Sequence, residues 1–273
     1  MKGMFDLTGK VAIVIGGNGR LGKQFCRSLH SYGAKVYCCD IKIDDAIHKM
    51  DSEPERYVTV KLDATKKEEL VAFRERIKKN DGRLDILVNS TTMKGKDFYL
   101  PFEDVSLESW DIGILGNLTM PFLAIQAFAP LMVEQKNGSI INISSHYGMV
   151  GNDQRIYEGS NLDEVYVDSK EPAKKRLYSH GVYNAAKGGL INFTRYLAAY
   201  YGHNNIRVNC ISPGGIHNPD ENKEFLRRYS EKVPLGRKAH EHEVNGAVVF
   251  LASDASTYIT GHNLVIDGGY TIW

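Results

Sequence analysis

The chain has 273 residues, a formal net charge of +1, 42% hydrophobic residues and 25% charged residues. This length suits one large α/β domain, and the composition is that of a globular protein rather than a disordered one. A net charge so close to zero gives no overall field that attracts nucleic acid or an anionic membrane, so we expect neither as a partner.

The four cysteines are scattered, without the C-x-x-C spacing of a zinc or redox site. They are Cys26, Cys38, Cys39 and Cys210. The first apolar run begins at Val11, which leaves no room for an export segment, and no apolar run reaches the roughly 18 residues of a membrane helix. We therefore expect a cytoplasmic protein with reduced thiols.

Short apolar runs alternate along the chain with longer amphipathic stretches. The predicted strands are Val11–Ile15, Lys35–Cys39, Tyr57–Leu62, Leu84–Val88, Ser139–Ile143, Ile206–Ile211 and Asn263–Ile266. Helices are predicted from about 20 to 30, after a capping box at Thr65 to Glu68, from about 106 to 135, and from about 183 to 200. Nearly continuous apolar strands that alternate with helices are typical of a parallel sheet buried on both faces. We expect an α/β fold, a doubly wound parallel sheet of about seven strands with helices on both faces, in a single domain spanning residues 1–273.

A glycine-rich segment separates the first predicted strand from the first helix. It reads Gly16-Gly17-Asn18-Gly19-Arg20-Leu21-Gly22. Glycines at this place let backbone amides approach a pyrophosphate at a helix N-terminus, whereas the alternative is an ordinary turn.

Asp40 ends the second predicted strand, where a carboxylate can accept hydrogen bonds from both hydroxyls of an adenosine ribose. The same carboxylate would repel a 2′-phosphate, so the sequence favours NAD(H) over NADP(H). Arg20 and Lys42 could each approach a 2′-phosphate, which leaves NADP(H) open.

Tyr183 and Lys187 lie four residues apart and therefore on one face of a predicted helix. The ammonium can lower the pKa of the phenol from its ordinary value of about 10, and a phenol tuned in this way can exchange a proton with a substrate. The same spacing occurs by chance in many helices. Here, Ser144 and Ser145 follow a buried strand upstream.

With these motifs in place, the chain resembles the short-chain dehydrogenase/reductase family along nearly its whole length. The matching pieces follow one another in the family's order: the glycine turn, Asp40, Asp63-Ala64, Asn89-Ser90-Thr91, Asn117, Asn142 to Ser145, Tyr183 to Lys187, Pro213-Gly214, Leu251 to Asp254, and Asp267-Gly268-Gly269. The resemblance implies a Rossmann fold and an enzyme that interconverts a secondary alcohol and a ketone by hydride transfer to or from a nicotinamide cofactor.

The resemblance also implies a catalytic set of four residues. Tyr183 would be the acid/base and Ser145 would polarise the substrate oxygen, with Ser144 as the alternative serine. Lys187 would bind the nicotinamide ribose and lower the pKa of the tyrosine, and Asn117 would hold a water that connects the lysine to solvent.

The cofactor residues implied by the resemblance are spread over six segments. They are Gly16, Asn18, Gly19, Arg20, Leu21, Gly22, Asp40, Ile41, Asp63, Ala64, Asn89, Ser90, Thr91, Tyr183, Lys187, Pro213, Gly214 and Ile216. From its local sequence, Asp63 reads equally well as a residue that leads into the next helix. The chain departs from the family's pattern at Ile15, where threonine is usual, in the spacing of its glycines, and at Ser90-Thr91, where alanine and glycine are usual.

The segment from Gly151 to His180 is longer than a strand-to-helix connection requires. It starts at the carboxyl edge of the predicted sheet, where ligands bind in open α/β folds, so we expect it to border the substrate. Its polar and aromatic residues suit a sugar-like substrate, and Arg155, Tyr157 and Glu158 are the best candidates because they follow the catalytic strand most closely. The run Arg155 to Gly159 also resembles a subgroup in bacterial flagellin-glycosylation and legionaminic-acid pathways. A solvated excursion or a subunit contact is the alternative.

The sequence thus favours an NAD(H)-dependent oxidoreductase of a small, polar, sugar-derived substrate. An NADPH-dependent 3-oxoacyl-(acyl-carrier-protein) reductase and a non-catalytic NAD-sensing scaffold are the alternatives. His240-Glu241-His242-Glu243 resembles a metal cluster but opens a helix, so we expect no metal there. The family usually forms tetramers or dimers, and the tail Tyr270 to Trp273 fits a subunit interface.

Overall fold

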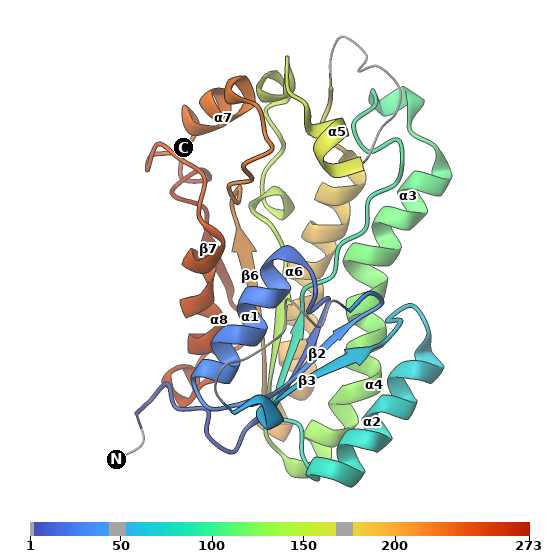
Figure 1. Ribbon diagram of the computed structural model, residues 1–273, viewed down its shortest axis with the longest axis vertical. Helices are drawn as coiled ribbons and strands as arrows, with labels where there is room; N and C mark the ends of the chain where they lie inside the picture. Colours follow the sequence, from blue (N-terminus) through green and yellow to red (C-terminus); the bar gives the residue numbers. More distant parts are fainter. Residues whose placement is uncertain (1–2, 44–52, 168–176) are drawn as a thin grey trace.

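The computed structural model describes residues 3–43, 53–167 and 177–273. Seven strands form one parallel sheet in the order β3-β2-β1-β4-β5-β6-β7 (Figure 1). They are β1 (Val11–Ile15), β2 (Lys35–Asp40), β3 (Tyr57–Lys61), β4 (Ile86–Asn89), β5 (Gly138–Ile143), β6 (Ile206–Pro213) and β7 (Asn263–Ile266). The predicted fold class is confirmed. The strand order reverses between β1 and β4, the point at which sheets of this kind bind ligands.

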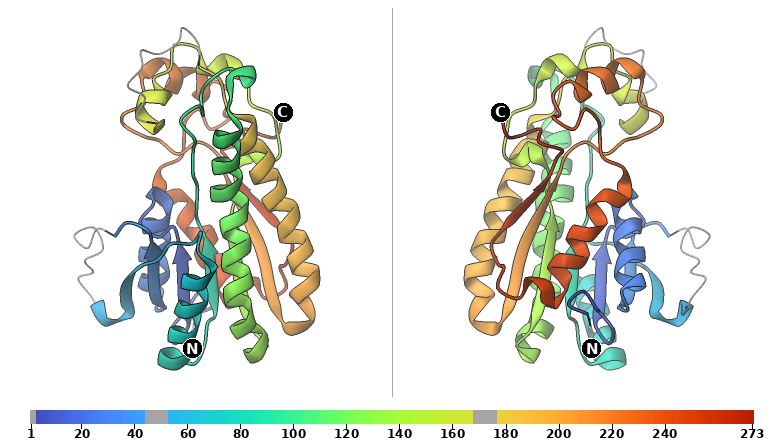
Figure 2. Two further views of the ribbon diagram at one scale, coloured as in Figure 1. Left: turned by 90° about the vertical axis from the view of Figure 1, so that its right-hand side faces the viewer. Right: turned by 90° about the vertical axis from the view of Figure 1, so that its left-hand side faces the viewer.

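Helices cover both faces of the sheet (Figure 2). Their bounds are α1 (Arg20–Ser31), α2 (Lys67–Asp81), α3 (Leu107–Ile114), α4 (Met120–Gln135), α5 (Leu162–Val167), α6 (Gly181–Tyr201), α7 (Lys223–Ser230) and α8 (Asn245–Ala252). One face packs against α1 and α8, and the other packs against α2, α4 and α6. Because both faces are buried, the strands are apolar at consecutive positions, which is the pattern that predicted them.

The predicted capping box of α2 is wrong. The helix begins at Lys67, and the side chain of Lys66, its N-cap residue, accepts no hydrogen bond. Instead, the carboxylate of Asp63 accepts hydrogen bonds from the amide (3.0 Å) and the hydroxyl (2.7 Å) of Thr65. Glu69 rather than Glu68 reaches back and accepts from the amide of Asp63 (3.0 Å). Because the helix begins two residues later than predicted, Thr65 lies before the N-cap position, where its hydroxyl donates to Asp63.

A π-helical turn, Leu115–Thr119, joins α3 and α4 into one helix from Leu107 to Gln135. By length and composition this helix could cross a membrane. Its residues Ala124, Phe128 and Met132 are fully buried against the sheet and α2, as in the core helix of a globular fold. Turns of this type occur often at functional sites, and this one contains Asn117.

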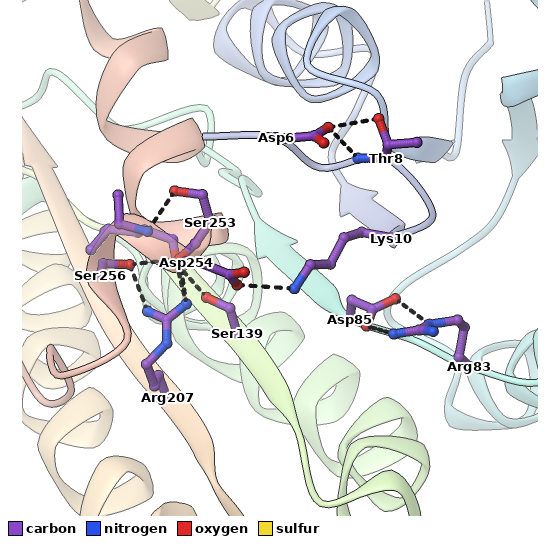
Figure 3. Close-up of polar contacts among 12 residues, drawn as sticks. Asp6, Thr8, Lys10, Arg83, Asp85, Ser139, Arg207, Ser253, Asp254 and Ser256 are labelled. Atoms are coloured by element: carbon purple, nitrogen blue, oxygen red, sulfur yellow. Dashed lines mark hydrogen bonds and ion pairs between the residues drawn. The ribbon is translucent and has the colours of Figure 1, made fainter. Parts of the chain in front are cut away.

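Polar contacts hold the amino-terminal edge of the sheet together (Figure 3). Asp85 accepts hydrogen bonds from the amide of Val11 (2.8 Å) and from Arg83 (2.8 Å). On the other side, Arg207 donates to the carbonyl of Leu251 (2.8 Å) and to Ser256 (2.9 Å). The opposite, carboxyl-terminal edge is covered by α5 and α7 (Figure 1), two helices that the sequence analysis did not predict.

Candidate active site

A cavity of about 340 Å³ lies at the carboxyl ends of the strands. The loops after β1, β4, β5 and β6 form its floor, and the segment 151–167 and α7 form its roof. The cavity surface includes Ser145, Tyr183 and Lys187, which are far apart in the sequence. The fold therefore brings three of the four expected catalytic residues to one surface.

Ser144 and Ser145 have different environments although they are adjacent. The hydroxyl of Ser144 donates to the backbone carbonyl of Lys187 (2.9 Å), which ties β5 to α6. The hydroxyl of Ser145 accepts from the amide of Tyr147 (3.2 Å), and it interacts with the phenol of Tyr183 closely enough to oppose the rise in the pKa of that phenol. This arrangement favours Ser145 as the serine that meets a substrate.

Tyr183 and Lys187 lie on the same face of α6, and the lysine Nζ is 5.7 Å from the centre of the tyrosine ring. Lys187 is buried, and its Nζ donates to the carbonyls of Ile143 (2.8 Å) and Thr91 (3.5 Å). Burial lowers the pKa of Lys187 to about 8. Burial also raises the pKa of Tyr183, and the interaction with Ser145 offsets only part of that rise. The pKa of the phenol is therefore raised rather than lowered in this arrangement, because desolvation by burial is the largest influence on it.

Asn117 is fully buried and is not part of the cavity surface. Its amide nitrogen donates to the carbonyls of Gly113 (2.9 Å) and Met93 (3.2 Å). Its Oδ1 has no hydrogen-bond partner among the described residues. A buried carbonyl oxygen without a partner is unusual and is compatible with a bound water at this point.

The glycine turn is closely packed, as a pyrophosphate site requires. Gly16 has a positive φ of 79°, and a Cβ on Gly22 would lie 2.0 Å from the carbonyl oxygen of Gly16. The first turn of α1 contains no acidic residue, and the N-cap Gly19 has no side chain to occupy the free amides. Gly19, Arg20, Leu21 and Gly22 reach the cavity surface. This helix terminus therefore fits the phosphates of a dinucleotide.

Asp40 lies beside the glycine turn at the end of β2. Its Oδ2 accepts from the amide of Asn18 (3.0 Å) and its Oδ1 accepts from the amide of Lys42 (3.2 Å). Each oxygen keeps lone pairs that can accept hydrogen bonds from a ribose. Arg20, a candidate for binding a 2′-phosphate, is instead ion-paired with Glu241.

The remaining predicted cofactor residues fall into two groups. Ser90, Thr91, Pro213, Gly214 and Ile216 reach the cavity surface. The cavity surface does not include Gly16, Asn18, Asp40, Ile41, Asp63, Ala64 or Asn89. Asn89 donates to Asn142 (2.9 Å) inside the sheet, and Asp63 holds Thr65 ahead of α2, so both have structural contacts that explain their residue types.

The long segment after β5 borders the cavity, as expected, through Tyr157, Leu162, Tyr166 and Ser179. Arg155 and Glu158 do not reach the cavity. The side chain of Arg155 is 74% exposed and is ion-paired with Asp153, and Glu158 is ion-paired with Arg228 of α7. In a tight helical turn, Gln154–Tyr157, successive side chains point in different directions, which proximity in sequence could not reveal. Asp168 and residues 174–176 of this segment lie outside the described residues.

Several residues of the cavity surface were not predicted from the sequence. They are Lys94, Phe98, His146, Tyr147, Glu221, Tyr229 and Lys238. His146 could have been found, since it directly follows Ser145. Lys94, Glu221 and Lys238 come from three separate loops, and only the folded chain brings them together.

The histidine and glutamate cluster at 240–243 is engaged in contacts within the protein. Glu241 pairs with Arg20, and Glu243 pairs with Arg237 (2.6 Å) while it accepts from the amide of His240 (2.7 Å). In residues 3–43, 53–167 and 177–273, no group of three or more His, Cys, Asp or Glu side chains could hold a metal ion.

Comparisons with known proteins agree with this arrangement. Residues 10–160 match the family described as short chain dehydrogenase, and residues 169–271 match the one described as Enoyl-(Acyl carrier protein) reductase. An NAD-dependent glycerol dehydrogenase of Listeria innocua is 32% identical over 98% of this chain and 96% of its own. A 3-oxoacyl-[acyl-carrier-protein] reductase of Thermotoga maritima is 31% identical over 97% of this chain and 99% of its own. The crystal structure of a short chain dehydrogenase of Leptospira borgpetersenii with bound NAD+ superposes with a TM-score of 0.83, at 33% identity, over 97% of this chain and 94% of that one.

Proposed function

The chain belongs to the short-chain dehydrogenase/reductase family of oxidoreductases, and we propose that it interconverts a secondary alcohol and a ketone on a small, polar, sugar-derived substrate with NAD(H) as cofactor. The observation that carries the proposal is the meeting of Ser145, Tyr183 and Lys187 on one cavity surface beside the glycine turn.

A bound nicotinamide would supply the hydride donor or acceptor. The protein's own part is to position the substrate oxygen and to move a proton. The Ser145 hydroxyl, which lies with Tyr183 on the cavity surface, would bind that oxygen, and the Tyr183 phenol would donate or accept the proton. Burial raises the pKa of this phenol, so it is protonated at neutral pH and ready to act as an acid in ketone reduction. Lys187 would bind the nicotinamide ribose, and Asn117 would hold a water behind the lysine.

The proposed preference for NAD(H) rests on Asp40 and Arg20. The carboxylate lies beside the turn that would hold the phosphates, and the hydrogen bonds that it accepts from Asn18 and Lys42 come from backbone amides rather than from a basic side chain. The guanidinium of Arg20 is already ion-paired with Glu241, which reduces its attraction for a 2′-phosphate. The similarity to an NAD-dependent glycerol dehydrogenase supports the same preference.

The proposed class of substrate rests on the cavity. Its roof presents Tyr157, Tyr166 and Ser179, and its wall presents Lys94, Glu221 and Lys238. Such groups suit a compact molecule with several hydroxyls. The resemblance of the run Arg155 to Gly159 to flagellin-glycosylation and legionaminic-acid enzymes adds to the proposal of a sugar-derived substrate. Of the substrate-binding residues proposed in this run, only Tyr157 lies on the cavity surface.

A 3-oxoacyl-(acyl-carrier-protein) reductase is the second candidate, favoured by the similarity to the Thermotoga enzyme. It requires room for an apolar acyl chain and a preference for NADPH. Buried charges in the cavity wall and the carboxylate at the end of β2 both favour the first candidate. We further propose that the chain acts as a single domain in a cytoplasmic homo-tetramer or homo-dimer.

One pair of measurements tests the proposal. Titration with NADH and NADPH, followed by the change in nicotinamide fluorescence, is expected to show tighter binding of NADH. Turnover is then measured on a panel of polyols, deoxy sugars and amino sugars, free and phosphorylated, with 3-oxoacyl thioesters as the second arm. The Tyr183→Phe variant should keep its affinity for NADH within about twofold and lose at least about 10³-fold in kcat, because only the proton-transferring oxygen is removed. Retained turnover in this variant would refute the assignment of the acid/base.

A further inference from the structure

Three charged side chains of the cavity wall take no part in the proposed chemistry. Lys94 follows β4, Glu221 precedes α7, and Lys238 lies in the loop after α7. Charges that are removed from water are unfavourable unless they are paired, so the way in which these three charges are compensated bears on the ligand. These three charges therefore carry information about the ligand.

Two of the three charges neutralise each other. The Nζ of Lys238 lies 2.5 Å from each carboxylate oxygen of Glu221, and the two side chains are 5% and 1% exposed. The phenol of Tyr166 in α5 also donates to this carboxylate (2.8 Å). Glu221 is thus engaged in hydrogen bonds within the protein, and the three side chains together leave one positive charge in excess.

Lys94 is the charge that remains. Its Nζ lies 3.9 Å from the centre of the Tyr166 ring and 5.2 Å from the centre of the Phe98 ring. Within residues 3–43, 53–167 and 177–273 the structure shows no hydrogen-bond acceptor and no carboxylate in an ion pair with this ammonium. Burial and the nearby Lys238 lower the pKa of Lys94 to about 8, while Glu221 opposes that shift, so the side chain is charged at neutral pH.

Lys94 is also close to the proposed reaction centre. The Lys94 ammonium lies 5.2 Å from the centre of the Phe98 ring, and the ring of Tyr183 lies 6.2 Å from the same centre in an edge-to-face arrangement. The Lys94 ammonium and the proposed acid/base therefore share Phe98 as a neighbour. Lys94 and Tyr183 line the same cavity of about 340 Å³, so one small molecule that fills the space between them would contact both side chains.

His146, at the serine end of the same cavity surface, carries no charge. Its Nδ1 donates to the carbonyl of Pro213 (3.0 Å), which leaves Nε2 as a hydrogen-bond acceptor. That Nε2 is buried and has no partner among the described residues. Burial lowers the pKa of His146 to about 4, so the ring stays neutral and adds no second excess positive charge to the cavity wall.

We propose that Lys94 binds an anionic group of the substrate, a carboxylate or a phosphate ester, while the reacting carbon lies at Ser145 and Tyr183. The inference rests on the proposed function and narrows its substrate to small hydroxy or keto acids, or their phosphorylated equivalents. An uncharged polyol would leave the Lys94 ammonium without a counter-charge, so it is expected to bind weakly.

Binding to the NADH-loaded protein tests the proposal without requiring turnover. The probes are matched sets of two to six carbons, each with an uncharged polyol, its hydroxy acid and its phosphate ester, as in glycerol, glycerate and glycerol 3-phosphate. Calorimetry compares the parent with Lys94→Met and with a control, Lys96→Met, which removes an exposed lysine outside the cavity. We expect at least one anionic probe to bind the parent at least 30-fold more tightly than its polyol does, and to lose that advantage in Lys94→Met only.

If the hydroxy acids lose affinity in Lys94→Met, the anion is a carboxylate, and if the phosphate esters do, it is a phosphate. The inference is overturned if no anionic probe discriminates between the parent and Lys94→Met while circular dichroism shows both folded. Its failure is distinct from that of the proposed function, because inactivation by Tyr183→Phe can still hold when Lys94 proves irrelevant.

Discussion

At the scale of single residues, burial sets the electrostatics of the proposed catalytic pair. Lys187 and Tyr183 share a helix face, but desolvation lowers the pKa of the lysine and raises that of the tyrosine. Both changes favour the uncharged forms. The site thus retains a buried ammonium that folding alone does not favour, which is the pattern expected of a group kept for function rather than stability.

A pH-dependent stability follows for Lys187. Its pKa is about 8 in the folded protein against 10.5 ordinarily, so between these values the unfolded chain holds a proton that the folded one has released. The contribution of Lys187 to the free energy of unfolding therefore rises as the pH rises from about 8 to 10.5. Lys187→Met should be more stable than the parent at pH 7, and this advantage should shrink by about 2 kcal/mol on going to pH 10, since one pKa unit is about 1.4 kcal/mol.

Urea unfolding of both proteins at the two pH values measures the difference. The contributions of the other titrating groups are the same in both proteins and cancel in the difference between their free energies of unfolding. The carbonyl of Ile143 loses its donor in the variant, which changes that difference by the same amount at both pH values. Lys96→Met, which removes an exposed ammonium, serves as the control. A stability difference that does not change with pH would contradict the account of Lys187.

At the scale of elements, the sequence predicted the strands, which are recurring apolar runs, and missed short helices that depend on contacts made only in the folded chain. All seven strands were found because each is an apolar run buried on both faces. The short helices α5 and α7 were missed because they lie in segments without a long apolar period. Contacts with neighbouring segments hold α7, since its N-cap residue Asn222 also donates a hydrogen bond to the carbonyl of Gly159 (2.7 Å).

The same distinction applies to the site. Ser145, Tyr183 and Lys187 were found because two of them share one helix turn and the third follows a recognisable strand. Glu221 and Lys238 are paired only through the path of the chain around α7, and nothing in their local sequences indicates the pair. Arg155 was predicted to bind the substrate because it follows the catalytic strand closely in sequence, but its side chain is exposed and ion-paired with Asp153 outside the cavity.

The turn between β1 and α1 yields a prediction at this scale. A Cβ on Gly22 would lie 2.0 Å from the carbonyl oxygen of Gly16, and this backbone atom cannot move without opening the turn. Gly22→Ala should therefore weaken NADH binding at least tenfold and destabilise the protein by about 1–3 kcal/mol.

Gly246→Ala is the matched control, since Gly246 lies in α8 with open space around its Cβ position. It should leave NADH affinity unchanged and stabilise the protein by up to about 1 kcal/mol, because alanine is the better helix former. Fluorescence titration and urea unfolding provide both quantities. Equal NADH affinity in the two variants would show that the close packing of the turn does not serve the cofactor.

At the scale of the whole molecule, the outer faces of α4 and α6 carry an exposed aromatic ridge. Its members are Phe122, Phe193, Tyr196 and Tyr200, with successive ring centres 6.3, 6.2 and 6.0 Å apart. Tyr196 is 61% exposed and Tyr200 is 56% exposed. Contiguous exposed rings on a folded domain commonly mark an interface, so this ridge supports the proposed homo-oligomer.

The C-terminal tail fits the proposed interface only in part. Tyr270 is buried in its own subunit, where its ring lies 4.7 Å from that of His146 and 5.4 Å from that of Tyr229. It therefore supports the cavity wall rather than a neighbouring molecule. Ile272 and Trp273 are 76% and 78% exposed and remain available for a subunit contact.

The aromatic ridge gives the test of assembly. Replacing Tyr196 and Tyr200 together by Glu places two carboxylates where the proposed interface would exclude water, and burying such charges unpaired is strongly unfavourable. Light scattering should show a smaller particle than the parent, with the circular dichroism of a folded chain. Tyr258→Glu, at a fully exposed tyrosine outside the ridge, is the control and should leave the mass unchanged. If the double variant keeps the parent's mass, the ridge is not the interface. Removal of Ile272 and Trp273 then decides whether the tail holds the subunits together, without disturbing Tyr270 and the cavity behind it.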